Sequence, residues 1–409
     1  MKKVLLLVAL MAASSASFAQ KSLLNKAKLA LQEATAGQKN VDETKLGEVM
    51  TMLETCMKDP VSGVLGETYS TAGRVQAYYM QNMLNKRSVG EEMDMDKFFD
   101  LQGKIVDLYS QAYKFDHTPN AKGKYALKPE EMQNNTKFYQ QIAGGPRSNL
   151  FIAASNLVNS DPDRCIMFVD KFEKTFSDPL FEGVVDASLD SSRVDATYFK
   201  AAALKSKAKT AADSTALIPM LEKSLASKNY AVMACNDLME IYKQRGQMDK
   251  WCEICDKGMA IDPSQKFFPK VKLEYLSNEK KFDEAKALCK VLKERYPDDD
   301  YAFYTEGVMF FQDNKYAEAV EAFKAAAAVT GTNAEAWSSA GTATWKIAMD
   351  NRTKTDVCTK YINEAVGYFK KAEELAPENP RLWGYFLYQA YTSLKKPADA
   401  KKYVQYKDL

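Results

Sequence analysis

Two cysteines form the one pair in the sequence whose spacing matches a known catalytic motif. Cys252 and Cys255 lie in segment 251–255 (WCEIC), with the two-residue spacing of a dithiol redox centre. That chemistry needs the first thiol at the start of a helix that follows a strand, because the helix dipole and free amides there lower its pKa. No strand pattern precedes these cysteines. We therefore predict that they pack inside a helix, with an incidental disulfide or a redox centre as the alternatives.

No other residues have the types and spacing of a catalytic or metal site. His117 is the only histidine, so a histidine-rich zinc site is excluded and a Ser-His-Asp arrangement would depend on that side chain. Its polar neighbours indicate a surface turn. The sequence contains neither a phosphate-binding glycine loop nor a Gly-x-Ser-x-Gly nucleophile turn. We expect no catalytic, cofactor-binding or metal-binding residues and no enzymatic activity.

Two polar segments carry weaker signals. Asp213-Ser214-Thr215 resembles an acceptor for O-linked glycans on exported bacterial proteins, with a polar turn between helices as the alternative. The acidic run Asp298 to Asp300 indicates a solvated turn, because a chain with 54 carboxylates produces such runs by composition alone. We expect no chemistry from that run.

The first residues have the pattern of a secretory signal peptide. Lys2 and Lys3 precede the apolar run Val4 to Ala12, and small residues lead to Ala19. We predict cleavage after Ala19 and export to the periplasm or the medium, without a lipid anchor because no cysteine follows the apolar run. No later segment approaches the roughly 18 unbroken apolar residues of a membrane span. The mature protein is expected to be soluble, without membrane insertion.

The charges of the mature chain balance. The sequence has 56 basic and 54 acidic side chains, and loss of Lys2 and Lys3 leaves 54 of each (56 − 2 = 54). Such a chain has no overall field that would attract nucleic acid or an anionic membrane. Nucleic acid is therefore not an expected partner.

A regular repeat organises the C-terminal half. The turns at Pro263, Pro297 and Gly331 are equally spaced (297 − 263 = 331 − 297 = 34). Between the turns the apolar residues have helical spacing, with two helices in each unit. A mature chain of 390 residues (409 − 19) is too long for one hydrophobic core of roughly 250 to 300 residues, so stacked repeats resolve that problem.

The clearest unit resembles the tetratricopeptide repeat. It runs from 300 to 333 and has the order of large and small residues typical of that family: Phe303, Gly307, Phe310, Ala319, Phe323 and Ala326. The resemblance implies an all-α fold, a right-handed superhelical solenoid of antiparallel helix pairs. The interval from Ala319 to its counterpart Ala365 is longer than one period (365 − 319 = 46 instead of 34). We therefore predict an insertion near Asn351 to Thr359 that lengthens both helices of that unit.

We divide the chain into four parts on this basis. Residues 1–19 are the signal peptide, 20–145 divergent helical repeats, 146–197 a degenerate repeat and a linker, and 198–409 tetratricopeptide repeats. The last part has units starting near 198, 232, 266, 300, 334 (with the insertion) and 380, followed by a lysine-rich cap. Loops are expected at 116–129, at Gly144-Gly145-Pro146 and at 183–193.

The repeat register also bears on the cysteines. Seven are scattered through the chain, too few for a disulfide framework, and an odd number leaves at least one unpaired within a monomer. The register would place Cys235 and Cys255 on facing helices of one unit. A disulfide between them stays open.

In tetratricopeptide arrays the first helix of each pair lines a concave groove, and the register here makes half of that groove aromatic. The predicted partner-binding residues are Tyr301, Tyr304, Phe311, Trp345, Tyr385 and Tyr388. Exposed aromatic clusters mark contact sites, because rigid rings bury large areas at low entropic cost. The alternative is that the lengthened helices cover these rings.

The expected function is therefore that of a scaffold or adaptor in the bacterial cell envelope that binds a protein or peptide partner without catalysis. The alternative is a glycan-binding protein on the same scaffold, because aromatic platforms also bind sugars. An enzyme is the third and weakest possibility.

Overall fold

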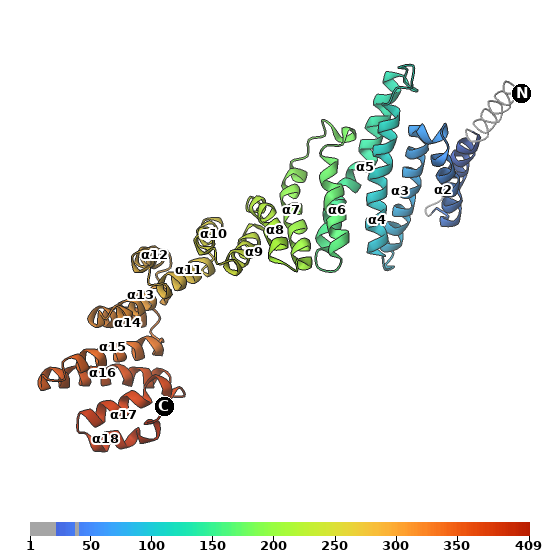
Figure 1. Ribbon diagram of the computed structural model, residues 1–409. Helices are drawn as coiled ribbons and strands as arrows, with labels where there is room; N and C mark the ends of the chain where they lie inside the picture. Colours follow the sequence, from blue (N-terminus) through green and yellow to red (C-terminus); the bar gives the residue numbers. More distant parts are fainter. Residues whose placement is uncertain (1–21, 37–40) are drawn as a thin grey trace, which may run out of the picture. The chain divides into compact units, whose positions relative to one another are not determined.

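The structure is a computed structural model that describes residues 22–36 and 41–409 (Figure 1). The predicted signal peptide and its cleavage site after Ala19 lie outside the described residues. All regular elements in the described residues are helices, so the prediction of an all-α fold is confirmed. Among them, none of the helices combines the length and the apolar content that crossing a membrane requires.

The chain divides into two compact units, 1–241 and 242–409. Residues 22–35 are helical and precede α2 (Glu43–Lys58), α3 (Gly66–Ser88), α4 (Met95–Asp116), α5 (Pro129–Leu157), α6 (Pro162–Thr175), α7 (Ala187–Lys207), α8 (Ala211–Ser224) and α9 (Ala231–Gln244). The second unit contains α10 (Met248–Ile261), α11 (Phe267–Asn278), α12 (Phe282–Arg295), α13 (Tyr301–Gln312), α14 (Tyr316–Thr330), α15 (Ala334–Asp350), α16 (Thr355–Leu375), α17 (Gly384–Ser393) and α18 (Pro397–Lys402). From α2 to α8 and from α10 to α18, each helix packs against the next.

A left-handed residue joins the two helices of a pair at regular intervals. Gly246, Lys280 and Asn314 have φ of 66°, 57° and 59°, and they are equally spaced (280 − 246 = 314 − 280 = 34); Lys395, at φ 55°, ends α17 in the same way. The amide after each of them donates to a carbonyl five residues back, of Tyr242, Leu276, Phe310 and Tyr391, over 2.8 to 3.0 Å. This bond is typical of a Schellman helix end. The same backbone conformation therefore recurs with the period of the sequence repeat.

Within a pair, a glycine of the first helix lies beneath an aromatic ring of the second. A Cβ added to Gly307 on α13 would lie 2.6 Å from Phe323 Cδ1 on α14, and one added to Gly341 on α15 would lie 2.7 Å from Phe369 Cε1 on α16. In the first unit Gly73 on α3 has the same relation to Tyr109 on α4, at 2.8 Å. We call these contacts the glycine seats. The divergent N-terminal part thus keeps the packing of the clear repeats.

The predicted insertion lengthens both helices of its pair. α13 and α14 have 12 and 15 residues, whereas α15 and α16 have 17 and 21. Ile362 of α16 is buried and packs in a cluster with Ala348 of α15. The added turns therefore extend the contact between the two helices, as predicted.

Two of the three expected loops are wrong in whole or in part, and the alternative of a polar turn at 213–215 is also wrong. Gly144, Gly145 and Pro146 lie inside α5, where both sides of the proline are held by buried residues such as Ala143 and Leu150. Tertiary packing there outweighs the cost of an interior proline, about 3 kcal/mol. The expected linker 183–193 is helical from Ala187, where Asp186 caps α7. The segment 213–215 lies in the first turn of α8, capped by Thr210, and the expected loop 116–129 is confirmed.

The glycine seat predicts opposite effects for two alanine substitutions. Gly307→Ala would force its Cβ against the Phe323 ring, and overpacking of this kind costs about 1 to 3 kcal/mol. Gly367→Ala on α16 is the matched control, because a Cβ there meets no atom within 4 Å. Replacing glycine by alanine in an unobstructed helix raises the free energy of unfolding by about 0.5 to 1 kcal/mol. Urea unfolding followed by circular dichroism measures both; equal midpoints would mean that the ring moves aside without cost.

The recurrent turn gives a second pair of predictions. Lys280 is exposed and left-handed, so Lys280→Gly should raise the free energy of unfolding by about 0.5 to 1 kcal/mol. Gly246→Ala, at the equivalent residue one repeat earlier, should lower it by about 1 kcal/mol. Thermal unfolding curves test the signs, and a shift of both variants in one direction would contradict a shared turn geometry.

Candidate partner-binding surface

The six predicted groove residues lie on the first helices of three successive pairs in the second unit. Three are on α13, one on α15 and two on α17: Tyr301, Tyr304, Phe311, Trp345, Tyr385 and Tyr388. Tyr385 is 37% exposed, and the other five are half-buried. Each ring therefore contributes to packing and also presents an edge or a face to solvent.

The structure groups these residues into separate clusters. Tyr304 and Phe311 pack on one cluster, which includes Phe323 and Ala340. Trp345 and Tyr388 pack on another, around Phe369. Tyr301 belongs to a third cluster, formed by α11, α12 and α13.

Neighbouring side chains fix several of these rings. Tyr304 is tilted against Phe323, with ring centres 5.3 Å apart, and its hydroxyl is 3.1 Å from Ser339 Oγ on α15. Phe311 meets the edge of Tyr316 at 5.2 Å, and Tyr385 meets that of Phe386 at 5.5 Å. Because these rings are already ordered, a partner that covered them would lose little further side-chain entropy on binding.

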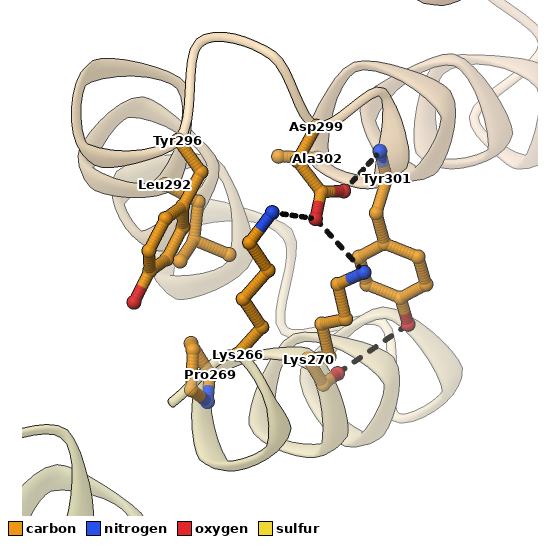
Figure 2. A pocket seen from close by; sticks show the side chains of 8 residues that line it. All are labelled: Lys266, Pro269, Lys270, Leu292, Tyr296, Asp299, Tyr301 and Ala302. Atoms are coloured by element: carbon orange, nitrogen blue, oxygen red, sulfur yellow. Dashed lines mark hydrogen bonds and ion pairs between the residues drawn. The ribbon is translucent and has the colours of Figure 1, made fainter. Parts of the chain in front are cut away.

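Tyr301 lies beside two lysines that converge on one carboxylate. Lys266, the residue before α11, and Lys270 of α11 each place Nζ 3.0 Å from Asp299 Oδ2. Figure 2 shows both side chains pointing at this carboxylate. Tyr301 donates its hydroxyl to the Lys270 carbonyl, and its amide donates to Asp299 Oδ1. The space among these groups is about 10 Å³, the size of one water. The cluster therefore ties α11 to α13 and leaves no room for an organic ligand.

Charge and burial act in opposite directions on Asp299. Burial tends to raise the pKa of its carboxyl, but the hydrogen bonds from Lys266 and Lys270 outweigh this effect and hold the pKa below its usual value. The segment 298–300 is a turn and Asp298 is exposed, as expected, but the expectation of a solvated side chain is wrong for Asp299, which is only 13% exposed. Asp300 is also engaged, accepting a hydrogen bond of 2.7 Å from Asn333 Nδ2. The repeat register was the available signal, since Lys266 and Asp299 stand almost one period apart in the sequence.

An open groove that the sequence did not predict lies along α12, α13 and α14. It has a volume of about 550 Å³ and is lined by Lys293, Phe303, Glu306, Phe310, Ala317, Glu318, Glu321, Ala322 and Ala325. Lys293 pairs with Glu306 and lies 4.7 Å from the centre of the Phe303 ring. Phe303 and Phe310, two of the residues that carry the resemblance to the tetratricopeptide repeat, are thus partly exposed.

The two spaced cysteines lie in the interior of α10, as predicted. Cys255 is completely buried, and burial raises the pKa of the half-buried Cys252 thiol. A raised pKa disfavours the thiolate that redox exchange needs. Whether Cys235 and Cys255 form a disulfide stays open.

The single histidine ends α4. The His117 ring stacks on Tyr113, with ring centres 3.9 Å apart, and its Nδ1 is 2.9 Å from the Tyr113 carbonyl oxygen. Nowhere in residues 22–36 and 41–409 do three His, Cys, Asp or Glu side chains gather closely enough to hold a metal ion.

Comparisons with known proteins find distant structural likenesses. No protein-family model matches the sequence, and no curated protein is similar enough to count as a relative. A MamA protein structure is 19% identical, with 45% of this chain and 94% of that chain covered and a TM-score of 0.32. Yeast Tom70 is 12% identical, with 94% and 91% covered and a TM-score of 0.33. The TPR domain of P58(IPK) is 14% identical, with 91% and 99% covered and a TM-score of 0.25.

The fold is a tetratricopeptide-like helical repeat. This conclusion rests on the left-handed turn that joins the helices of four pairs, at residues 246, 280, 314 and 395, and on the glycine seats at Gly307 and Gly341. The unit boundaries near 198, 232, 266, 300, 334 and 380 stay a prediction.

The lysine–aspartate cluster predicts a dependence of stability on pH. Asp299→Asn should lower the unfolding midpoint at pH 7 by about 2 °C, because the carboxylate that holds two lysines is lost. A depressed folded-state pKa stabilises the fold above the unfolded pKa of about 3.9 and loses that effect as pH falls through the folded value. Wild type and variant should therefore converge as pH falls below the unfolded-state pKa and through the lower folded-state pKa of Asp299. Asp298→Asn, at an exposed neighbour, is the control, and a pH-independent difference would contradict the assignment.

Proposed function

We propose that this protein is a non-catalytic scaffold or adaptor that binds a protein or peptide partner along the first helices of the repeats in its second unit. The observation that carries the proposal is that the six aromatic residues on the first helices α13, α15 and α17, which we call the aromatic row, are all partly exposed. Aromatic residues, above all tyrosine and tryptophan, dominate the energetics of protein interfaces because each covers a large area with few rotatable bonds.

The chemistry of the row favours a protein over a nucleic acid. Its six residues carry no charge, while the nearby lysines 266 and 270 are bound to Asp299. A nucleic-acid site needs unpaired cations in number to neutralise phosphates. Polar atoms next to the rings, such as the Ser339 and Tyr304 hydroxyls, suit the main-chain groups of a peptide.

The place of action that we propose is the bacterial cell envelope. This part of the proposal rests on the N-terminal sequence, with Lys2 and Lys3 before an apolar run and small residues up to Ala19. Chemical or mass-spectrometric sequencing of the mature N-terminus tests it: a chain that starts at Gln20 agrees, and one that keeps Met1 does not.

Site-specific photocrosslinking in the native cell tests the binding surface. A benzoylphenylalanine at position 385 should form a covalent adduct with one defined protein, because Tyr385 is the most exposed ring of the row. The matched control places the same amino acid at position 375, where Leu375 on α16 is similarly exposed, at 38%. Adducts at both positions, or at neither, would contradict the proposed surface.

Calorimetry with oligosaccharides distinguishes glycan binding from the proposed binding of a protein partner. If the row binds sugars, oligosaccharides should release heat with the wild type and not with Tyr385→Ala. Such a result, without any protein adduct at position 385, would replace the protein partner by a glycan.

A further inference from the structure

The C-terminal end of the second unit contains an open pocket with an excess of positive charge. It lies between α17 and α18, has a volume of about 330 Å³ and is lined by Tyr388, Thr392, Lys395, Lys396, Pro397, Ala400, Lys401 and Val404. Three of these eight residues are lysines and none is acidic. The nearest carboxylate in sequence, Asp399, is engaged by Lys402 at 2.9 Å.

These three lysines differ from others at the junctions between repeats. Lys266 and Lys270 share Asp299, and Lys293 pairs with Glu306 on the following repeat. In the first unit Lys205 of α7 lies 2.7 Å from Asp237 of α9. Lys395, Lys396 and Lys401 are exposed and have no ion pair within the described part of the chain. Within the described residues, these three lysines are therefore available to the carboxylates of a partner.

The apolar side chains of the pocket are also left partly uncovered. Elsewhere in the unit, each pair is covered by the next one: α14 packs against α15, and α16 against α17. At the end, the Tyr388 ring is half-buried and Val404 is 45% exposed, beside Pro397 and Ala400. This apolar strip between lysines fits a helix with an apolar face flanked by carboxylates.

We propose that the α17–α18 pocket docks an acidic amphipathic helix of a partner protein, because its apolar lining lies between lysines that have no ion pair in the described residues. The inference deepens the proposed function, on which it rests for the partner being a protein, and Tyr388 belongs to both surfaces. The first helix of a second copy fits less well, because residues 22–35 carry Lys26 and Lys28 against Glu33 alone. Like charges would face one another there.

Fluorescence polarisation with designed peptides tests the proposal on the full chain. The probe is a labelled peptide of about four helical turns with leucines on one helical face and glutamates beside them, and its partner probe has glutamine in place of every glutamate. We expect the acidic peptide to bind at least about tenfold more tightly than the glutamine peptide, and its affinity to fall as salt rises.

Charge-matched variants locate the site. Lys395→Gln, Lys396→Gln and Lys401→Gln together should weaken the acidic peptide by about tenfold or more. The control combines Lys257→Gln, Lys290→Gln and Lys354→Gln, three exposed lysines away from the pocket, which remove the same charge and should change affinity less than about twofold. The unfolding midpoints of both triple variants should stay close to that of the wild type, because none of the six lysines forms an ion pair in the described residues.

Several results would overturn the inference. Equal losses in the two triple variants would mean a general charge effect, and displacement of the peptide by millimolar inorganic phosphate would mean a simple anion site. No binding by the acidic peptide also rejects the pocket, and concentration-dependent dimers in sedimentation that disappear in the first triple variant would assign it to a second copy. Crosslinking at position 385 is read separately: adducts there without peptide binding reject only the end pocket, and peptide binding without adducts rejects only the aromatic row.

Discussion

The close approach of a glycine to an aromatic ring sets the distance between the helices of a pair. Gly307 admits the Phe323 ring to a separation at which any side chain would collide, and Gly341 does the same for Phe369. That separation brings the alanines at 319 and 326 into the interior, where both are completely buried. The first helix of each pair can then present its other side to solvent. The exposure of the aromatic row in the second unit therefore depends on interior contacts between glycine and ring, which a bound partner would not touch.

The sequence predicts those parts of the fold that are repeated and fails where packing between helices decides. Gly307, Ala319 and Phe323 stand at fixed offsets, so their packing follows from the register alone. Pro146 and its glycines have local propensities for a loop, yet buried neighbours on both sides keep α5 continuous. For the candidate site, the repeat register predicts that the aromatic residues lie on the first helices of their pairs. The exposed fraction of each ring depends on neighbouring helices and required the structure. The lysine pocket at the C-terminus required the fold, since its residues come from two helices and the turn between them.

A chain with no net field still has a strong local order of charge. Basic and acidic side chains meet at junctions such as Lys293 with Glu306 and Lys205 with Asp237, and the exposed ones contribute little each to stability. The last pair departs from this order, because the lysines of its pocket have no ion pair in the described residues. The structure shows this local excess of positive charge, whereas the composition of the chain does not.

The helices in each unit pack mainly on their sequence neighbours, and this has a mechanical consequence. No distant strand or buried centre holds the two ends of such a stack in the described residues, so its stability is a sum over adjacent pairs. Pulled from its C-terminus, the second unit should extend in steps of one helix pair, with the long α15–α16 pair as the largest step.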